Sequence, residues 1–157
     1  MIIRLSKGNN KQDTLTCVRT DGSTTWTNLH PNMFQHDLMH YAVETTLGLQ
    51  NSFFGQVASG IDINEFNKPT NQRGFKIPVE AIQTEYIVGL VQVELSDGAV
   101  FEDFNDQLQK SLATKNIPIP EQLTNANLDK IRTKFKQLLR QLVGLKPGDY
   151  LELAFVE

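Results

Sequence analysis

Two histidines, His36 and His40, lie four residues apart in the chain, and their type and spacing could support metal chemistry. On an α-helix, residues four apart project from the same face, separated by about 6 Å along the axis. Two imidazoles in this arrangement can bind one transition-metal ion. We therefore predict His36 and His40 as metal ligands, with a divalent transition metal such as zinc as the cofactor.

Two acidic residues, Asp37 and Glu44, are placed to orient these imidazoles through hydrogen bonds. Glu44 lies about 12 Å along the helix axis from His36, which is too far for both to bind one ion, but only one turn from His40. A hydrogen bond to His40 is therefore its easier role. A catalytic zinc site usually needs a third protein ligand. The sequence does not choose among five candidates, which are His30, Asp62, Glu65, Glu80 and Glu85.

The histidine segment approaches the zinc-protease motif His-Glu-x-x-His, with Asp37 in place of the glutamate that acts as general base. We exclude a peptidase because aspartate is one methylene shorter and no further ligand follows at a recognised spacing. Two other interpretations stay open. The histidines could be structural, each bonded to a nearby carboxylate or carbonyl. Alternatively, one could be a metal-free general base that Asp37 or Glu44 orients.

Composition excludes several broad classes of protein. The 157 residues carry a formal net charge of -3, so we expect no nucleic-acid partner. No apolar run approaches membrane-spanning length and the start lacks the pattern of a signal peptide, so we expect no membrane association and a cytoplasmic location. The lone Cys17 excludes an internal disulfide, and we interpret it as a packing or surface residue. A basic run that alternates with apolar residues indicates the solvated side of an amphipathic helix; it comprises Lys130, Arg132, Lys134, Lys136 and Arg140.

The two ends of the chain are predicted to share one antiparallel sheet. The first thirty residues read as a three-stranded meander with an Asp-Gly hairpin turn at 21–22. The segment 150–156 alternates well enough for a final strand, which most economically joins the meander and brings the termini together. Such a sheet needs helices to cover one of its faces.

Helical periodicity accounts for most of the chain between these strands. The histidine helix is expected to begin at Asn32 and end at Gly48, with the histidines at the border between core and solvent. A central buried helix is expected from Pro78, with a strand over 87–95 as the rival interpretation. Its apolar residues are the stripe Ile82, Tyr86, Leu90 and Val93 at helical spacing, together with Ile87, Val88 and Val91. The other expected elements are a short helix over 53–60, a loop over 62–74, a helix over 101–112, and a last helix capped by Thr124 or Asn127 that ends at Gly144. The prediction is one α+β domain over 1–157, with four to five helices packed on a small antiparallel sheet.

The run 31–60 resembles a family of small bacterial proteins for which no activity is established. The shared pattern is His-Asp-Leu-x-His-x-x-Val-Glu, then Leu-Gly-Leu, then an aromatic-x-Gly-x-x-Ala-x-Gly stretch, and the ending Leu-Lys-Pro-Gly-Asp-Tyr-Leu-Glu-Leu-Ala-Phe is also similar. The chain departs from the pattern at Phe34-Gln35, where Leu-Pro is expected, and at Phe54, where tryptophan is frequent. The resemblance implies a bacterial source and a single domain, and it transfers no catalytic role.

Two hypotheses about function follow. In the first, the helix that carries His36 and His40 forms a metal or ligand site. In the second, the protein is a non-catalytic binding or regulatory module with structural histidines, which docks a protein partner through its sheet or near Phe53-Phe54. The sequence does not decide whether the protein is an enzyme.

Overall fold

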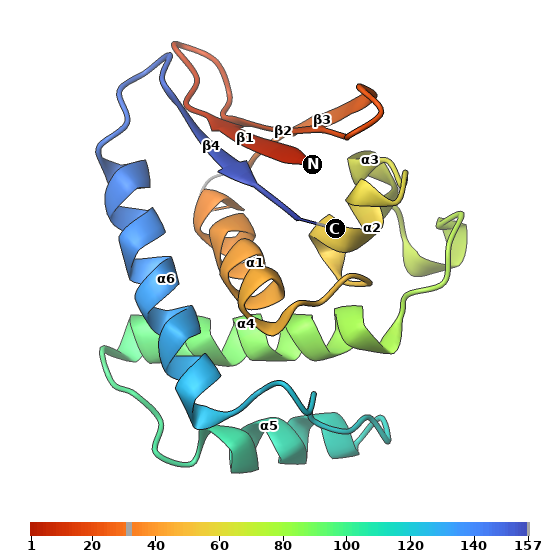
Figure 1. Cartoon of the computed structure of the whole chain (residues 1–157), viewed down its shortest axis with the longest axis vertical. Helices are drawn as coiled ribbons and strands as arrows, with labels where there is room; N and C mark the ends of the chain where they lie inside the picture. The colour runs from red at the N-terminus through yellow and green to blue at the C-terminus, as the bar shows by residue number, and fades with distance from the viewer. Residues whose placement is uncertain (31–32, 157) are drawn as a thin grey trace.

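The computed structural model describes residues 1–30 and 33–156, and it has an α+β fold in which a sheet covers a group of helices (Figure 1). The four strands are β1 (Ile2–Ser6), β2 (Thr14–Val18), β3 (Thr24–Asn28) and β4 (Tyr150–Ala154). They pair antiparallel in the order β3-β2-β1-β4. The last strand therefore joins the meander as predicted, and the backbones of Met1 and Phe155 exchange hydrogen bonds beyond it.

Strand alternation gives the sheet one apolar face, because successive side chains point to opposite sides. Ile3, Leu5, Leu15 and Leu151 are buried against the helices. Cys17 belongs to the same face, so it is a packing residue, and burial raises the pKa of its thiol to about 12.

Six α-helices and one 3₁₀ turn occupy the rest of the described chain. The helix α1 (Met33–Leu47) lies directly beneath the sheet and packs on α4 and α6, while α5 packs on the far side of α4 (Figure 1). Gly48 follows α1 in the left-handed conformation, which favours glycine and ends the helix there. The predicted cap Asn32 lies outside the described residues. The remaining elements are α2 (Phe53–Ala58), α3 (Ile63–Phe66), η1 (Thr70–Gln72), α4 (Val79–Asp97), α5 (Phe104–Ala113) and α6 (Asn125–Val143).

The structure corrects two expectations about these helices. The segment 62–74 is not simply a loop, because the Asp62 side chain accepts a hydrogen bond from the Asn64 amide and caps the one-turn helix α3. The 78–97 segment is helical, not a strand, but its predicted stripe is wrong, since Val93 is exposed. Ile87, Val88 and Val91 are buried as expected, and they share the buried side of α4 with three polar residues, Gln83, Thr84 and Glu94.

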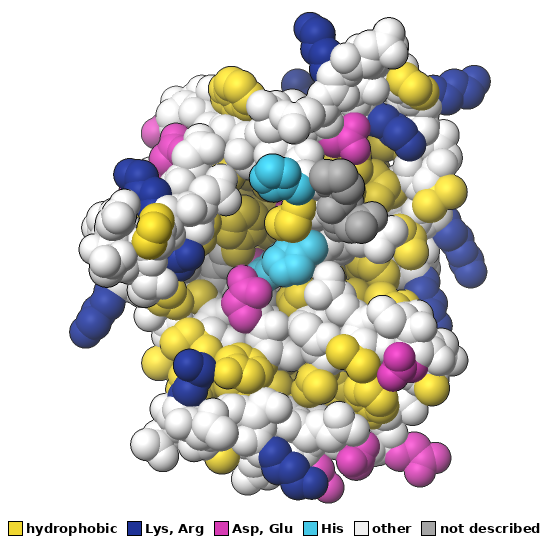
Figure 2. Space-filling view, turned by 180° about the vertical axis from the view of Figure 1, so that it is seen from behind, with side chains coloured by type: hydrophobic (Ala, Val, Ile, Leu, Met, Phe, Trp, Pro, Cys, Tyr) yellow, Lys and Arg dark blue, Asp and Glu magenta, His cyan; other side chains and the backbone are white. Residues whose placement is uncertain are grey.

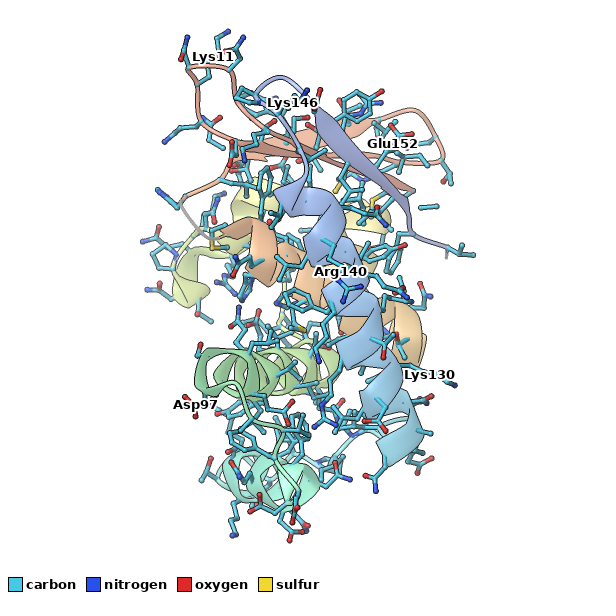
Figure 3. The ribbon with its side chains drawn as sticks, turned by 90° about the vertical axis from the view of Figure 1, so that its left-hand side faces the viewer. Lys11, Asp97, Lys130, Arg140, Lys146 and Glu152 are labelled. Carbon is cyan, nitrogen blue, oxygen red and sulfur yellow. The ribbon has the colours of Figure 1, made fainter. Side chains whose placement is uncertain are left out.

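The interpretation of α6 as an amphipathic helix holds, with two additions. Thr124 caps it, and Lys130 and Arg140 lie on its outer side (Figure 3). Arg132 and Lys134, however, turn inward to Glu94 and Thr45. In the described part of the chain, no helix is both long enough and apolar enough to cross a membrane.

Candidate metal centre

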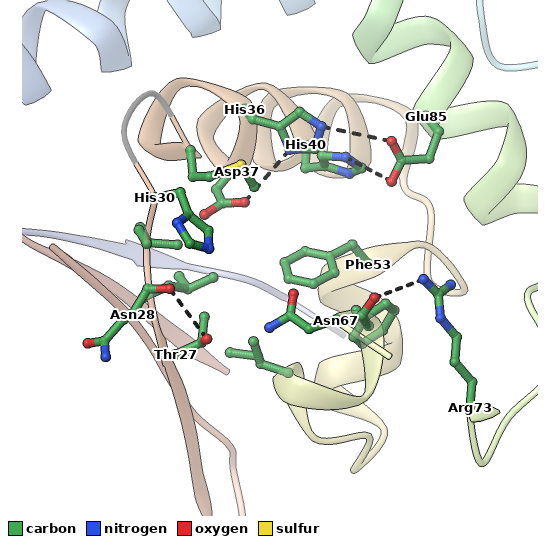
Figure 4. Close-up of a pocket in the computed structure, with 15 residues that line it drawn as sticks. Thr27, Asn28, His30, His36, Asp37, His40, Phe53, Asn67, Arg73 and Glu85 are labelled. Carbon is green, nitrogen blue, oxygen red and sulfur yellow. Dashed lines mark hydrogen bonds and ion pairs between the residues drawn. The ribbon is translucent and has the colours of Figure 1, made fainter. Parts of the chain in front are cut away.

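Three side chains from two helices converge on one point. His36 and His40 project from α1, and Glu85 reaches them from α4 (Figure 4). One potential ligand atom from each residue lies within 4.8 Å of the other two, and together they could hold a metal ion. We call His36, His40 and Glu85 the histidine cluster.

Each imidazole of the histidine cluster faces a carboxylate on both of its nitrogens. The Nε2 atom of His36 lies 3.8 Å from Glu85 Oε2, and its Nδ1 lies 3.9 Å from Asp37 Oδ1. The Nε2 atom of His40 lies 3.4 Å from Glu85 Oε1, and its Nδ1 lies 3.3 Å from Glu44 Oε1. The two rings are 4.7 Å apart between centroids, so both Nε2 atoms face the same carboxylate.

Glu44 is held in place by the start of α2. Its Oε2 accepts hydrogen bonds from the backbone amides of Phe54 at 2.9 Å and Gly55 at 3.3 Å, which leaves Oε1 for His40. Position 55 requires glycine, because a Cβ atom there would lie 2.1 Å from the carbonyl oxygen of Gln50 in the turn that leads into α2. The Leu-Gly-Leu turn and the aromatic-x-Gly stretch after α1 thus position one carboxylate.

The electrostatics of the histidine cluster favour retention of a proton. Burial alone would lower the pKa of His40, but Glu44 and Glu85 outweigh it and raise the pKa to about 10. Burial raises the pKa of Glu44 despite its bond with His40. Both shifts mean that the His40–Glu44 pair keeps its proton well above pH 7. Burial by itself would raise the pKa of Glu85, but the contact with His40 outweighs burial and lowers this pKa.

A cavity of about 340 Å³ opens beside the histidine cluster. Histidine side chains lie at a hollow on this face of the molecule, with an acidic side chain beside them (Figure 2). Asp37 also lines the cavity and is only 4% exposed, and its Oδ2 atom has no hydrogen-bond partner. Burial raises the pKa of this carboxyl group. Apolar residues form much of the remaining wall, including Leu15, Leu29, Met33, Phe53, Ile63 and Phe66.

The structure selects one of the five candidate third ligands. Glu85 joins the two histidines, whereas His30 is exposed and only lines the cavity. The other candidates serve elsewhere. Asp62 caps α3, Glu65 pairs with Lys68, and Glu80 accepts a hydrogen bond from the Asn51 amide.

The predicted hydrogen bond between His40 and Glu44 is present, but the expected border position is wrong for both residues. His40 and Glu44 are both buried, because α2 and α4 cover that side of α1. His36, one turn earlier on the same helix, remains partly exposed. No sequence pattern indicated Arg73, whose guanidinium lines the cavity and donates to the carbonyls of Phe66 and Lys68.

Comparisons of the chain with protein-family models, curated proteins and solved structures yield no significant match. The chemistry of the histidine cluster is therefore the basis on which a function can be assigned.

Proposed function

We propose that the protein binds one divalent transition-metal ion through the Nε2 atoms of His36 and His40 and the carboxylate of Glu85. The observation that carries the proposal is their convergence, which brings three ligand atoms within 4.8 Å of one another beside a cavity. Two imidazoles and one carboxylate form a donor set that suits zinc and also Fe²⁺.

The spacing of the ligand atoms is close to what a bound ion requires. In a tetrahedral zinc site with bonds of about 2.1 Å, neighbouring ligand atoms lie roughly 3.4 Å apart. The distance of 3.4 Å between His40 Nε2 and Glu85 Oε1 already matches this value. The His36 side chain is 29% exposed and that of Glu85 is 58% exposed, so both have room to close the longer distances.

The surrounding carboxylates support the same assignment. A histidine that ligates a metal usually donates its other N–H group to a carboxylate or carbonyl, which fixes the ring and raises its basicity. Glu44 lies 3.3 Å from Nδ1 of His40 in this arrangement, and Asp37 lies on the corresponding side of His36, 3.9 Å from an Nδ1 atom that has no hydrogen-bond partner. We therefore assign Glu44 and Asp37 to the orientation of the two imidazoles.

Three protein ligands leave a coordination position for a water molecule or a substrate. The cavity lies on the side of the histidine cluster where such a molecule would bind. A metal ion there would polarise a bound carbonyl or lower the pKa of a bound water molecule. The apolar wall contributed by Phe53 and Phe66 would limit the access of bulk water to this position.

Metal titration of the full chain without an affinity tag tests the proposal. We expect the protein, after chelator treatment and dialysis, to bind one equivalent of Zn²⁺ in calorimetry, and to bind Fe²⁺ under anaerobic conditions. Glu85→Gln and His36→Ala should each weaken zinc binding by more than about 100-fold, because each removes a ligand, which costs more than the loss of an outer partner.

Two matched variants serve as controls. His30→Ala removes the histidine that lines the cavity outside the histidine cluster, and Glu80→Gln changes a glutamate on α4 that points elsewhere. Both should bind zinc like the unmodified protein. Absence of stoichiometric binding, or equal losses in His30→Ala and His36→Ala, would assign the histidines a structural role and favour a non-catalytic module.

A further inference from the structure

We propose that the cavity binds a small primary amine that also carries an oxygen donor for the metal ion, with Asp37 accepting the hydrogen bond from the amine. This inference rests on the proposed metal site and adds the chemical class of its ligand. It follows from the Asp37 side chain, which lines the same cavity as the histidine cluster (Figure 4).

The Oδ2 atom of Asp37 is buried without a hydrogen-bond partner, although the residue is only 4% exposed. Buried polar atoms are nearly always paired, so an unpaired one next to a cavity points to a missing donor. The nearest ring nitrogen, Nδ1 of His36, lies 3.9 Å from the other oxygen, Oδ1, which is beyond hydrogen-bond distance, and this nitrogen also has no hydrogen-bond partner. Oδ2 therefore has room to accept a hydrogen bond from a ligand in the cavity.

The surroundings of Asp37 favour a donor with positive charge. Among the residues that the structure describes, no lysine or arginine lies within ion-pair distance of its carboxylate. The one arginine of the cavity wall, Arg73, donates instead to the carbonyls of Phe66 and Lys68. Since a buried carboxylate is stable only when it is paired, an ammonium group on the ligand supplies both the donor and the charge.

The position of Asp37 relative to the metal site sets the shape of this ligand. Asp37 faces Nδ1 of His36, while the proposed ion lies at Nε2 on the opposite side of the ring. The amine and the metal-binding oxygen must therefore be separate groups of one molecule. A cavity of about 340 Å³ is at the small end of ligand pockets, which limits the molecule to the size of a small metabolite.

Hydroxamates provide probes for this inference, because the hydroxamate group binds transition metals through its oxygens. The protein is loaded with Co²⁺, whose visible spectrum reports changes in coordination. Acetohydroxamate and propionohydroxamate are compared with their terminally aminated analogues, glycine hydroxamate and β-alanine hydroxamate. We expect at least one aminated probe to bind ten-fold or more tightly than its unaminated counterpart.

The preference should disappear in Asp37→Asn, which keeps the side-chain shape but removes the charge. It should persist in Asp129→Asn, since Asp129 is an exposed residue of α6 that pairs with Arg132, away from the cavity. Cobalt content is measured for every variant, so that altered metal binding is recognised separately.

Equal affinity for both probes of each pair, or a preference that survives Asp37→Asn, would overturn the assignment of Asp37. Stoichiometric cobalt binding without any hydroxamate response would reject the cavity as the ligand site and leave the metal site standing. Failure to bind cobalt at all would remove the proposed function together with this inference.

Discussion

The helix α4 contributes one glutamate to each of two charge clusters. The clusters differ in the type of cation they contain and in the exposure of their glutamate side chains. Near its C-terminal end, Glu94 is buried and accepts hydrogen bonds from both Nε and Nη2 of Arg132 and from the Phe101 amide. Arg132 also donates to Asp129. We call this group the arginine cluster.

The histidine cluster has the opposite properties. Its cations are imidazoles, which can lose a proton and then bind a metal, whereas a guanidinium stays charged in proteins. The side chain of Glu85, whose carboxylate the two histidines share, is 58% exposed, whereas the side chain of Glu94 is 4% exposed. It also borders a cavity with an unpartnered carboxyl oxygen on Asp37. The comparison assigns the arginine cluster to the stability of the fold, and it supports the proposal that the histidine cluster binds a metal ion.

Arg132→Leu should have the largest effect on stability, because it leaves the buried carboxylate of Glu94 uncompensated. We expect the free energy of unfolding to fall by about 3–5 kcal/mol. Urea denaturation measures the change, and Lys130→Leu, an exposed change on the same helix, should stay within about 0.5 kcal/mol. A loss below 1 kcal/mol would contradict the structural role of the arginine cluster.

Glu44→Gln should weaken zinc binding by about 10–100-fold, because the amide orients His40 less well than the carboxylate does. The side-chain oxygen of glutamine can still accept hydrogen bonds from the amides of Phe54 and Gly55, so the local backbone is retained. Calorimetric titration measures the affinity, with the exposed Glu121→Gln as the control. Unchanged affinity would show that Glu44 only supports the fold.

The stability of the metal-free protein should depend on pH through His40. The pKa of this group is 6.5 in the unfolded chain and is raised to about 10 in the fold. The folded state therefore binds the proton more tightly, so the stabilisation is complete below about pH 6.5 and is lost as the pH rises toward 10.

We expect a loss of at least about 1 kcal/mol between these pH values, measured by urea denaturation. Arg132→Leu should keep this slope, because Arg132 pairs with Glu94 and Asp129 and not with the carboxylates that face His40. His40→Gln should flatten the slope, and His30→Gln should not. A slope that is equal in the unmodified protein and in His40→Gln would disprove the raised pKa.

Glu85→Gln should have the smallest effect on the metal-free fold, in contrast to its strong effect on zinc binding. Its side chain is more than half exposed, so we expect a loss below about 1 kcal/mol in the free energy of unfolding. Thermal denaturation in the presence of a chelator measures it. A loss comparable to that of Arg132→Leu would mean that the two clusters have the same role.

The sequence predicts the parts of the histidine cluster that depend on local geometry. The four-residue spacing places His36 and His40 on one face of α1, and Glu44 one turn later reaches His40. It leaves Glu85 as one of five candidates, because the contact depends on how α1 and α4 pack. The apolar stripe of α4 does not predict this contact either, because the buried side of the helix also includes the polar residues Gln83 and Thr84.

The fold is predicted better where the alternation of apolar residues or a helix-ending residue such as glycine defines the elements. The strands follow period-two alternation, and Gly48 ends α1 at the expected residue. The helix α3 is missed because one turn is too short to produce a periodic pattern, and only its cap, Asp62, marks it. Arg73 has no pattern around it, since its position on the cavity wall comes from hydrogen bonds to nearby carbonyls.

The four-stranded sheet is complete only when β4 pairs with β1, so during synthesis on the ribosome one edge of β1 waits for its partner. The partner of Ile2–Ser6 on that side is Tyr150–Ala154, which emerges on the order of ten seconds later at typical elongation rates. Until then, one edge of β1 offers unpaired backbone groups beside Ile3 and Leu5, a surface prone to pairing with other nascent chains. We expect the emergence of β4, rather than formation of the helices, to be the event that ends this exposure.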